Sequence, residues 1–232
     1  MLSSVGKTIG IISGSGPEAG LDLHAKLLRA QRAALGERYR GDTDAPRVVT
    51  VSEPVLGLSM QLPDHEETVW SALLATAVQL APQVDVYAIA CNTLNVFENR
   101  LHDAELGAQL VTVTDVTRGF VRSRGLTRVG LLGAAPVTDL GEWSAYRPLL
   151  ETVDLVTPDD PAPLHRLIHD IKRRGHGGAE LEARFLPIVE ALDVDPVLLA
   201  CTELPLLDTA ALPVEAVDVT DLLAQYLVRV AG

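Results

Sequence analysis

A short apolar segment that ends in Ala-Cys occurs twice in this chain, and it constrains the fold more than any other feature. The first copy occupies residues 84–91 (VDVYAIAC) and the second occupies residues 194–201 (VDPVLLAC). Each copy opens with Val-Asp and continues as a run rich in Val, Ile and Leu, which predicts a strand buried on both faces of a parallel sheet. Ligands bind at the carboxyl ends of such strands. We therefore expect Cys91 and Cys201, the only two cysteines of the chain, at a binding edge.

Two further pairs of segments indicate that whole structural units repeat. Residues 9–14 (IGIISG) resemble residues 129–134 (VGLLGA), and both segments lead into a proline. Residues 113–117 (VTDVT) resemble residues 217–220 (VDVT), just after each Cys segment. Three markers in the same order predict an α/β fold of two similar α/β domains, whose parallel sheets are related by pseudo-two-fold symmetry. An active site in the interdomain cleft would place the two cysteines face to face.

The repeat also predicts the extent of each domain. We expect a first α/β domain of residues 1–115 plus 215–232 and a second of residues 116–214, because the last helix should pack back on the first half. Hydrophobic periodicity predicts strands at residues 8–12, 47–52, 84–90, 110–114, 128–132, 153–157, 194–200 and 214–217. It predicts helices at residues 17–35, 64–80, 94–106, 115–124, 138–151, 163–174, 179–192 and 220–230.

The composition is that of an ordinary globular protein. The 232 residues are 47% hydrophobic and 22% charged, enough for one large core or two modest ones. A net charge of −12 disfavours nucleic acid as a partner. We expect no membrane partner, because no run approaches the roughly 18 apolar residues of a membrane span and the amino terminus has no apolar signal core.

The cysteines and histidines give no sign of a disulfide framework or a metal site. Two cysteines far apart in the sequence favour a reducing compartment, and we expect a cytoplasmic protein. Only His165 and His169 have a spacing that could bring two imidazoles together on a helix, and such a pair alone is a weak zinc signal.

The glycine-rich segment Ser13-Gly14-Ser15-Gly16 follows the first predicted strand and leads into a helix at Pro17. One interpretation is a tight strand-to-helix turn. The other is a cradle in which backbone N–H groups at the helix start bind a carboxylate or phosphate. The segment lacks the three-glycine spacing of dinucleotide sites, which disfavours a nucleotide.

The surroundings of the two cysteines suggest acid/base chemistry. A thiol has an ordinary pKa of about 8.5, and a helix amino terminus lowers it. Asn92, Thr93 and Thr202 add amide and hydroxyl donors suited to a substrate carboxylate. Stereoinversion needs one group that removes a hydrogen and a second that delivers one to the opposite face of the same carbon. A free cysteine is often only a small buried hydrophobe, but two at equivalent places in a repeat favour function.

At these positions the chain resembles the cofactor-independent aspartate/glutamate racemases. The resemblance rests on residues 9–18 with their Gly-Pro-Glu-Ala ending, Cys91-Asn92-Thr93, residues 129–133 and Cys201-Thr202-Glu203. It implies two similar α/β domains, an interdomain active site, no pyridoxal phosphate or metal, and a homodimer. It also implies that Cys91 and Cys201 are the catalytic acid/base pair.

The chain departs from the common pattern of this family in the residues around the cysteines. Leu94-Asn95 stands where Ala-His is common, and Gly20 where a threonine is common. Residues 55–61 contain no arginine for a substrate carboxylate, and Ser59 lies about where one is expected. The departures suggest a substrate other than aspartate.

Lys172 and Glu203 are further candidates for substrate binding. Lys172 belongs to a basic helix end that could simply be solvated, or it could bind a distal carboxylate. Glu203 could orient a loop or a substrate amino group, or only cap the next helix.

The sequence thus predicts an isomerase, an amino-acid racemase that acts on a small carboxylate or amino acid. Its candidate substrate-binding residues are Ser13, Gly14, Ser15, Ser59, Asn92, Thr93, Lys172, Thr202 and Glu203. Two alternatives stay open. The chain could be another isomerase or decarboxylase of the same superfamily, of the maleate isomerase, hydantoin racemase or arylmalonate decarboxylase type, or it could be a ligand-binding relative that does not catalyse.

Overall fold

The two apolar Cys segments form the strands β3 (Val86–Ile89) and β7 (Val197–Ala200), each in the interior of a parallel four-stranded sheet. The computed structural model describes residues 6–232. Strand order is β2-β1-β3-β4 in the first sheet and β6-β5-β7-β8 in the second, and every pairing is parallel. The two sheets therefore have the same order, which confirms the predicted fold class.

The other elements follow in chain order. The first sheet is completed by β1 (Ile9–Ser13), β2 (Val48–Ser52) and β4 (Gln109–Leu110), and the second by β5 (Arg128–Gly133), β6 (Asp154–Val156) and β8 (Ala216–Asp218). The helices are α1 (Pro17–Leu35), α2 (Leu62–Leu80), α3 (Glu98–Asp103), α4 (Val113–Arg124), α5 (Ala135–Thr138), α6 (Ala162–Arg174), α7 (Ala179–Glu190) and α8 (Val219–Ala231).

The repeat extends to the packing of individual glycines in β1 and β5. Gly10 pairs with Tyr87 on β3, and a Cβ atom at Gly10 would lie 2.8 Å from the Tyr87 Cβ. Gly130 pairs with Val197 on β7, and a Cβ there would lie 2.7 Å from the Val197 Cγ1. Glycine in a strand interior commonly marks such a close approach. Glycine thus permits the same close approach of neighbouring strands in both halves.

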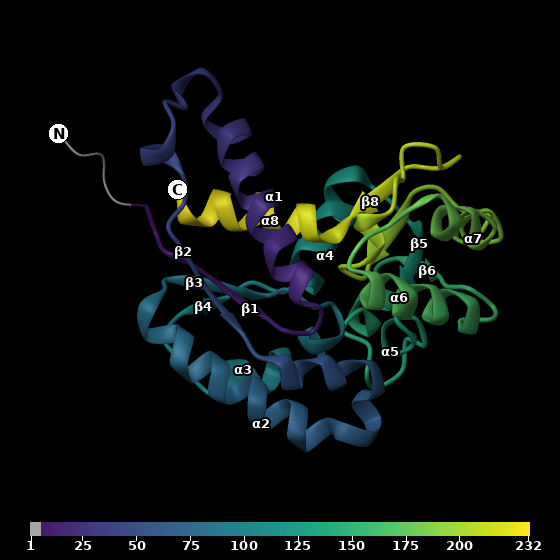
Figure 1. The fold of residues 1–232 in the computed structure, drawn as a ribbon, viewed down its shortest axis with the longest axis horizontal. Coiled ribbons are helices and arrows are strands. Elements are labelled where there is room, and N and C mark those ends of the chain that lie inside the picture. The colour runs from purple at the N-terminus through teal and green to yellow at the C-terminus, as the bar shows by residue number, and fades with distance from the viewer. Residues whose placement is uncertain (1–5) are drawn as a thin grey trace.

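Three helices lie between the two sheets and share one core with them. Helix α8 packs against α1 and α4, as expected of a last helix that returns to the first half. Figure 1 shows α8 running from the second sheet towards α1. One cluster of buried side chains joins Ile9 and Val86 of the first sheet to Val129 and Leu198 of the second. β8 itself belongs to the second sheet, and the division of the chain into two domains stays a prediction.

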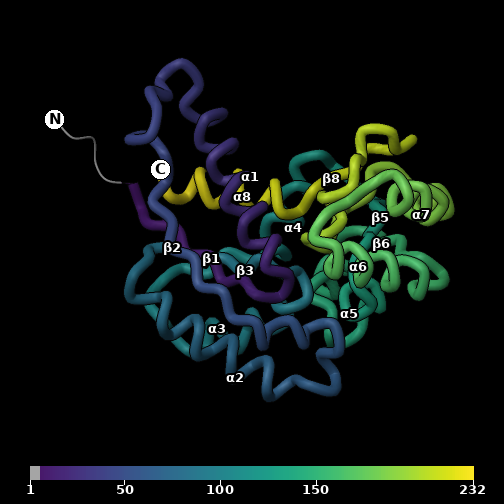
Figure 2. The backbone as a smooth tube through the Cα atoms, viewed as in Figure 1, coloured from purple at the N-terminus to yellow at the C-terminus, as the bar shows by residue number. Residues whose placement is uncertain are grey.

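The outer faces of the sheets are covered by separate helices. Helices α2 and α3 cover the first sheet with a cluster that includes Leu73, Leu80 and Leu101. Helices α6 and α7 cover the second with one that includes Ile168 and Phe185. The tube in Figure 2 separates these two outer pairs clearly. Cys91 belongs to the first of these outer clusters and Cys201 to the second.

The structure corrects three predicted elements. Residues 138–151 are not one helix: α5 ends at Thr138, Leu140 has a positive φ of 54°, and only a 3₁₀ turn follows at Arg147–Glu151. The strand predicted at 110–114 ends at Leu110, because the Thr112 side chain accepts a hydrogen bond from the Asp115 N–H and caps α4. The helix predicted at 94–106 is split into a 3₁₀ segment, Thr93–Phe97, and the short α3.

None of the helices within residues 6–232 is both long and apolar enough to cross a membrane.

Candidate active site

A small buried cavity lies where the carboxyl ends of β3 and β7 meet, and both cysteines line it. Its volume is about 10 Å³, which is about the space of one water molecule. The cavity is lined by Ser15, Ser59, Met60, Cys91, Asn92, Thr93, Ala134, Lys172, Ala200, Cys201, Thr202 and Glu203. The structure therefore holds the site closed, and any organic ligand needs the walls to separate.

Cys91 faces two serine hydroxyls from different parts of the first half. Its thiol donates to Ser15 Oγ at 3.3 Å, and Ser59 Oγ lies 3.8 Å from the sulfur. The two hydroxyls are hydrogen-bonded to each other at 2.7 Å. Ser59 is 1% exposed and lies in the 3₁₀ segment Pro54–Gln61 that follows β2. The residue found in place of an arginine is thus a neutral hydrogen-bonding group beside the sulfur.

Asn95 holds the loop after Cys91 in place. Its side-chain amide donates to the Cys91 carbonyl at 2.8 Å, and its Oδ1 accepts from the Val113 N–H at 3.1 Å. Asn95 is buried and joins the end of β3 to the start of α4. This departure from the common family pattern therefore has a structural role. The neighbouring Asn92 accepts a hydrogen bond of 2.5 Å at its Oδ1 from the hydroxyl of Tyr146.

Cys201 faces a buried carboxylate that is itself paired with a lysine. The thiol donates to Glu203 Oε2 at 3.0 Å, and the Thr202 hydroxyl donates to the same oxygen at 3.1 Å. The other oxygen, Oε1, lies 3.0 Å from Lys172 Nζ on α6. The Glu203 side chain is 6% exposed and that of Lys172 19%, so solvent screens this ion pair weakly. The surroundings of the two thiols therefore differ: neutral around Cys91, charged around Cys201.

The pKa of the Cys201 thiol is raised well above its ordinary value. Burial is the main cause, the negative charge of Glu203 adds to it, and Lys172 opposes it. This contradicts the expectation that a helix start lowers the pKa at this position. Only a 3₁₀ turn, Leu204–Leu206, follows, and it is too short to outweigh burial. Cys201 is accordingly a thiol at neutral pH.

Lys172 stays protonated in this setting. Burial acts to lower its pKa, but Glu203 and the two cysteines act in the opposite direction, and the net shift of the pKa is upward. Its ammonium group is therefore a permanent positive charge in the cavity wall, where Glu203 neutralises it.

The glycine-rich turn makes room for this ion pair. A Cβ atom at Gly16 would lie 2.3 Å from Glu203 Oε1 and 3.4 Å from Lys172 Nζ, and Gly16 has a φ of 86°. Ser13 and Gly14 do not line the cavity. A Cβ atom at Gly20 would lie 2.4 Å from Ser13 Oγ, so glycine at position 20 leaves room for the serine hydroxyl. Of the turn, Ser15 is the residue that reaches the cysteine.

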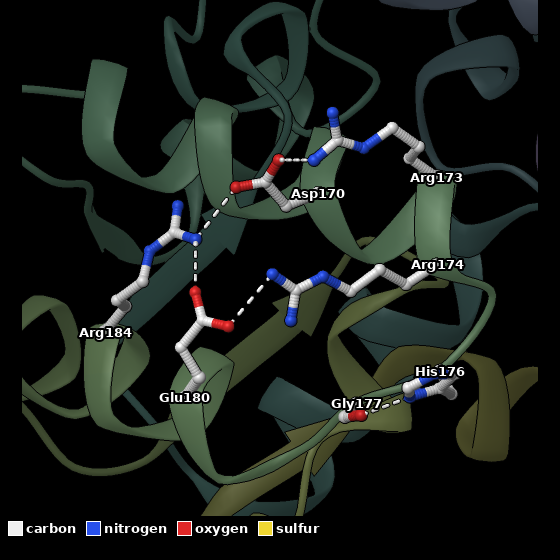
Figure 3. Close-up of polar contacts among 7 residues, drawn as sticks. All are labelled: Asp170, Arg173, Arg174, His176, Gly177, Glu180 and Arg184. Carbon is white, nitrogen blue, oxygen red and sulfur yellow. Dashed lines mark hydrogen bonds and ion pairs between the residues drawn. The ribbon is translucent and has the colours of Figure 1, made fainter.

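The basic end of α6 divides its residues between the cavity and the surface. Lys172 lines the cavity, whereas Arg173 pairs with Asp170 at 3.2 Å and Arg174 with Glu180 of α7 at 3.0 Å. Arg184 of α7 pairs with Asp170 at 2.8 Å. Figure 3 shows these ion pairs as a network between the two helices. The solvated interpretation therefore holds for the two arginines at the end of α6, and the network ties down the helix end that carries Lys172.

Among residues 6–232, no group of three or more His, Cys, Asp or Glu side chains is arranged to hold a metal ion. His165 and His169 do face each other, with ring centroids 6.5 Å apart, and His165 Nδ1 accepts from the Ala135 N–H at 3.4 Å. That contact gives His165 a structural partner.

The sequence predicted the polar residues of the cavity better than its other walls. Ser15, Ser59, Asn92, Thr93, Lys172, Thr202 and Glu203 all line it with the two cysteines. Met60, Ala134 and Ala200 were not predicted as lining residues, and Tyr146 fell within the helix predicted at 138–151. Met60 and Tyr146 have no local signal, because their roles depend on contacts between distant segments, whereas Ala134 and Ala200 belong to the repeated segments 129–134 and 194–201.

Two parallel sheets of the same strand order, each with a buried cysteine at the end of a central strand, define the class of protein, an α/β protein of two similar halves. The sequence model of one family covers nearly the whole chain: the Asp/Glu/Hydantoin racemase model matches residues 12–227. The chain belongs to the Asp/Glu/Hydantoin racemase family.

Solved structures of the same fold are similar along the whole chain. Aspartate racemase from Picrophilus torridus has a TM-score of 0.78 at 24% identity, over 98% of this chain and 95% of its own. An aspartate racemase homologue from Pyrococcus horikoshii OT3 has a TM-score of 0.76 at 24% identity, over 97% and 99%. Glutamate racemase from Francisella tularensis, in complex with D-glutamate, has a TM-score of 0.65 at 17% identity, over 97% and 80%. At these identities the likeness establishes the fold.

A curated relative matches about half of the chain. An uncharacterized protein from Pectobacterium carotovorum subsp. carotovorum is 30% identical over 129 residues, which are 53% of this chain and 85% of that protein.

Proposed function

We propose that this protein is a cofactor-independent racemase that inverts a stereocentre next to a carboxylate, with Cys91 and Cys201 as the two acid/base groups. One observation carries the proposal. The two cysteines, at equivalent ends of β3 and β7, line the same buried cavity. A stereoinversion needs this arrangement, because the hydrogen leaves one face of the carbon and a new one arrives at the other.

The proton balance is as follows. The thiolate of one cysteine takes the α-hydrogen as a proton, and the electron pair of the C–H bond moves into the substrate carboxylate system as an enolate. The thiol of the other cysteine donates its proton to the opposite face and becomes a thiolate. One thiol and one thiolate are present before and after, in exchanged places. No oxidant or reductant is consumed.

The raised pKa of Cys201 supports an assignment of the first roles. Cys201 is held as a thiol by burial and by Glu203, so it is the proton donor of the ligand-free protein. Cys91 is then the base for the enantiomer whose hydrogen points at it. In the ligand-free structure the Cys91 thiol donates to Ser15, and both serine hydroxyls lie within reach to donate to the sulfur when Cys91 acts as the base.

Donors for the substrate carboxylate come from both halves. Asn92 and Thr93 follow Cys91, and Thr202 follows Cys201; all three line the cavity. Donors placed where negative charge develops stabilise an enolate as well as a carboxylate. Glu203 can accept from a substrate amino group with the oxygen that it shares with Cys201 and Thr202.

Exchange of the α-hydrogen in deuterium oxide tests the proposal. Candidate amino acids are incubated with the protein, and NMR follows loss of the α-hydrogen signal while chiral chromatography follows inversion. Exchange together with inversion is the expected result. Exchange without inversion, or loss of carbon dioxide, indicates another isomerase or a decarboxylase of the superfamily. Binding without exchange indicates a ligand-binding relative and overturns the proposal.

We also propose that the protein acts in the cytoplasm as a homodimer. The support is the net charge, the two free cysteines and the family to which the chain belongs. Sedimentation equilibrium measures the association state, and a monomer at micromolar concentration contradicts the homodimer.

A further inference from the structure

Tyr146 contacts the site from outside it. Its side chain is fully buried, and its hydroxyl donates to Asn92 Oδ1 at 2.5 Å. Asn92 directly follows Cys91 and lines the cavity, whereas Tyr146 lies beyond β5 in the other half of the chain. The hydrogen bond therefore joins the two halves at the residue next to a catalytic candidate.

The backbone around Tyr146 is held on two sides. The Thr114 hydroxyl of α4 donates to the Ala145 carbonyl at 2.8 Å. The Ser144 hydroxyl donates to the Val137 carbonyl at 2.6 Å and accepts from the Tyr146 N–H at 3.3 Å. The ring packs in the core that joins both sheets. A phenol fixed in this way has little freedom to follow a moving partner, so it sets the position of the amide that it contacts.

The direction of the hydrogen bond determines what Asn92 offers to a ligand. An asparagine amide has one accepting oxygen and an NH₂ group with two donors. With the oxygen engaged by Tyr146, the NH₂ group is what remains for the cavity. An amide turned the other way would present its carbonyl oxygen to a carboxylate, and two acceptors facing each other repel. Burial raises the pKa of Tyr146, so its hydroxyl keeps its proton and stays a donor.

We propose that Tyr146 is a positioning residue, which holds the Asn92 amide with its NH₂ group towards the carboxylate of the ligand beside Cys91. The inference rests on the proposed function, because that function supplies the carboxylate. It further implies that the carboxylate site is complete only when both halves are together, because Asn92 belongs to the first half and Tyr146, which orients its amide, belongs to the second.

Matched removal of the hydroxyl from two buried tyrosines tests this role. Tyr146→Phe removes the hydrogen bond to Asn92. Tyr87→Phe is the control, because Tyr87 is 2% exposed, lies on β3 before Cys91, and lines a separate cavity with His102 and Glu105. For the substrate found in the exchange assay, KM should rise about tenfold in Tyr146→Phe with a smaller change in kcat, as expected for a weakened contact to a charged group. Tyr87→Phe should leave KM unchanged.

A double-mutant cycle separates positioning from a general structural effect. If Tyr146 acts through Asn92, Tyr146→Phe should change KM little in an Asn92→Ala background. An equal effect in both backgrounds, or a loss of kcat at constant KM, overturns the proposal.

Binding of propionate, followed by NMR titration, gives a readout that does not depend on turnover. Tyr146→Phe should weaken it about tenfold, by the same loss of a contact to a charged group, and Tyr87→Phe should not. If the wild type binds propionate in this way but racemises nothing, the proposed function fails and the role of Tyr146 stands. Binding equal in wild type and Tyr146→Phe, or no binding to the wild type, overturns the role of Tyr146.

Discussion

The thiol of Cys201 donates a hydrogen bond of 3.0 Å to Glu203 Oε2, whose other carboxylate oxygen is paired with Lys172. Ionising this thiol would place two negative charges side by side in a buried site. This is a physical reason why the pKa of Cys201 is raised, and burial adds the larger part. After burial, Glu203 thus contributes to the charge state of one of the two candidate acid/base groups.

The first prediction concerns the effect of Glu203 on the pKa of Cys201. In Glu203→Gln the negative charge is lost and Lys172 remains, so the pKa of Cys201 should fall. The ultraviolet absorbance of the thiolate, measured in a Cys91→Ser background, should appear at lower pH than with Glu203 present. Glu180→Gln is a matched control, because Glu180 pairs with Arg174 on the same helix as Lys172 but its side chain is 65% exposed. A thiolate titration whose midpoint stays at the same pH or moves to higher pH in Glu203→Gln contradicts the role of Glu203.

The second prediction concerns the two thiols. Cys91→Ser and Cys201→Ser should each abolish racemisation, because a hydroxyl is a far weaker acid than a thiol. Cys201→Ser can still exchange the α-hydrogen of the enantiomer that faces Cys91, whereas Cys91→Ser, whose remaining Cys201 is a thiol at neutral pH, should exchange the other enantiomer more slowly. Single-enantiomer exchange in deuterium oxide measures this. Both cysteines are buried small side chains, so the free energy of unfolding should change by about 1 kcal/mol or less. Racemisation near the wild-type rate in either variant would refute the two-base mechanism.

How well the sequence predicts the structure depends on how far apart in the chain the contacting residues lie. The strands that carry Cys91 and Cys201 are predictable because burial on both faces of a sheet selects a continuous apolar run. The helix predicted at 138–151 fails because residues 139–146 are fixed by tertiary contacts, such as the Ser144 hydroxyl to the Val137 carbonyl and Thr114 to Ala145. Local pattern carries no information about such contacts.

The candidate site likewise contains residues that the sequence predicts and contacts that it does not. Polar residues adjacent to the cysteines are predictable, because two equivalent strand ends mark them. The identity of their partners is not: Lys172 pairs with Glu203, and Tyr146 reaches Asn92 across 54 positions of sequence. The raised pKa of Cys201 follows mainly from burial, which only the folded chain creates, and Glu203, two residues further along the chain, adds to it.

The third prediction concerns Gly16. An added Cβ would lie 2.3 Å from Glu203 Oε1, so Gly16→Ala should displace the ion pair with Lys172. Racemisation should fall at least about tenfold, equivalent to about 1.4 kcal/mol of transition-state stabilisation. Gly36→Ala is the control: its φ is also positive, at 53°, but nothing lies within 4 Å of the added Cβ. Both glycines have a positive φ outside the left-handed α region, where an alanine is strained by roughly 1–3 kcal/mol, so equal activity in the two variants contradicts the steric argument.

The fourth prediction concerns stability and a buried lysine between the two halves. Lys26 of α1 is 3% exposed and pairs with Asp22 and with Asp218, the residue that caps α8. Lys26→Met leaves both carboxylates without their cation, and should lower the free energy of unfolding by about 3 kcal/mol in urea. Lys7→Met, at an exposed position, should have little effect.

The pH dependence of that loss has a definite sign. Burial raises the pKa of Asp218, and Lys26 opposes the shift. Without Lys26 the folded-state pKa of Asp218 rises further above its unfolded value, so the variant loses more stability as pH rises through that range. The deficit of Lys26→Met relative to wild type should therefore be largest at neutral pH and should shrink in acid. A deficit that is constant with pH would show that the lysine contributes packing only.

The last prediction concerns the charge of the substrate side chain. Around Cys91 the cavity offers Ser15 and Ser59 hydroxyls in place of an arginine, and the ammonium of Lys172 is neutralised by Glu203 at 3.0 Å. A hydrogen bond to a charged group contributes about 1.5–3 kcal/mol. Because no unpaired cation is offered to a substrate carboxylate by these residues, kcat/KM for aspartate should exceed that for neutral amino acids by less than about tenfold.

A substrate panel measured by chiral chromatography decides this, and Lys172→Ala identifies the role of the lysine. If Lys172 serves Glu203, its loss leaves a buried carboxylate unpaired, raises the pKa of Cys201 and lowers the rate for all substrates alike. If Lys172 binds a distal carboxylate, the loss falls on aspartate and glutamate only. A strong preference for acidic amino acids that persists in Lys172→Ala would contradict both roles and would require another cation at the site.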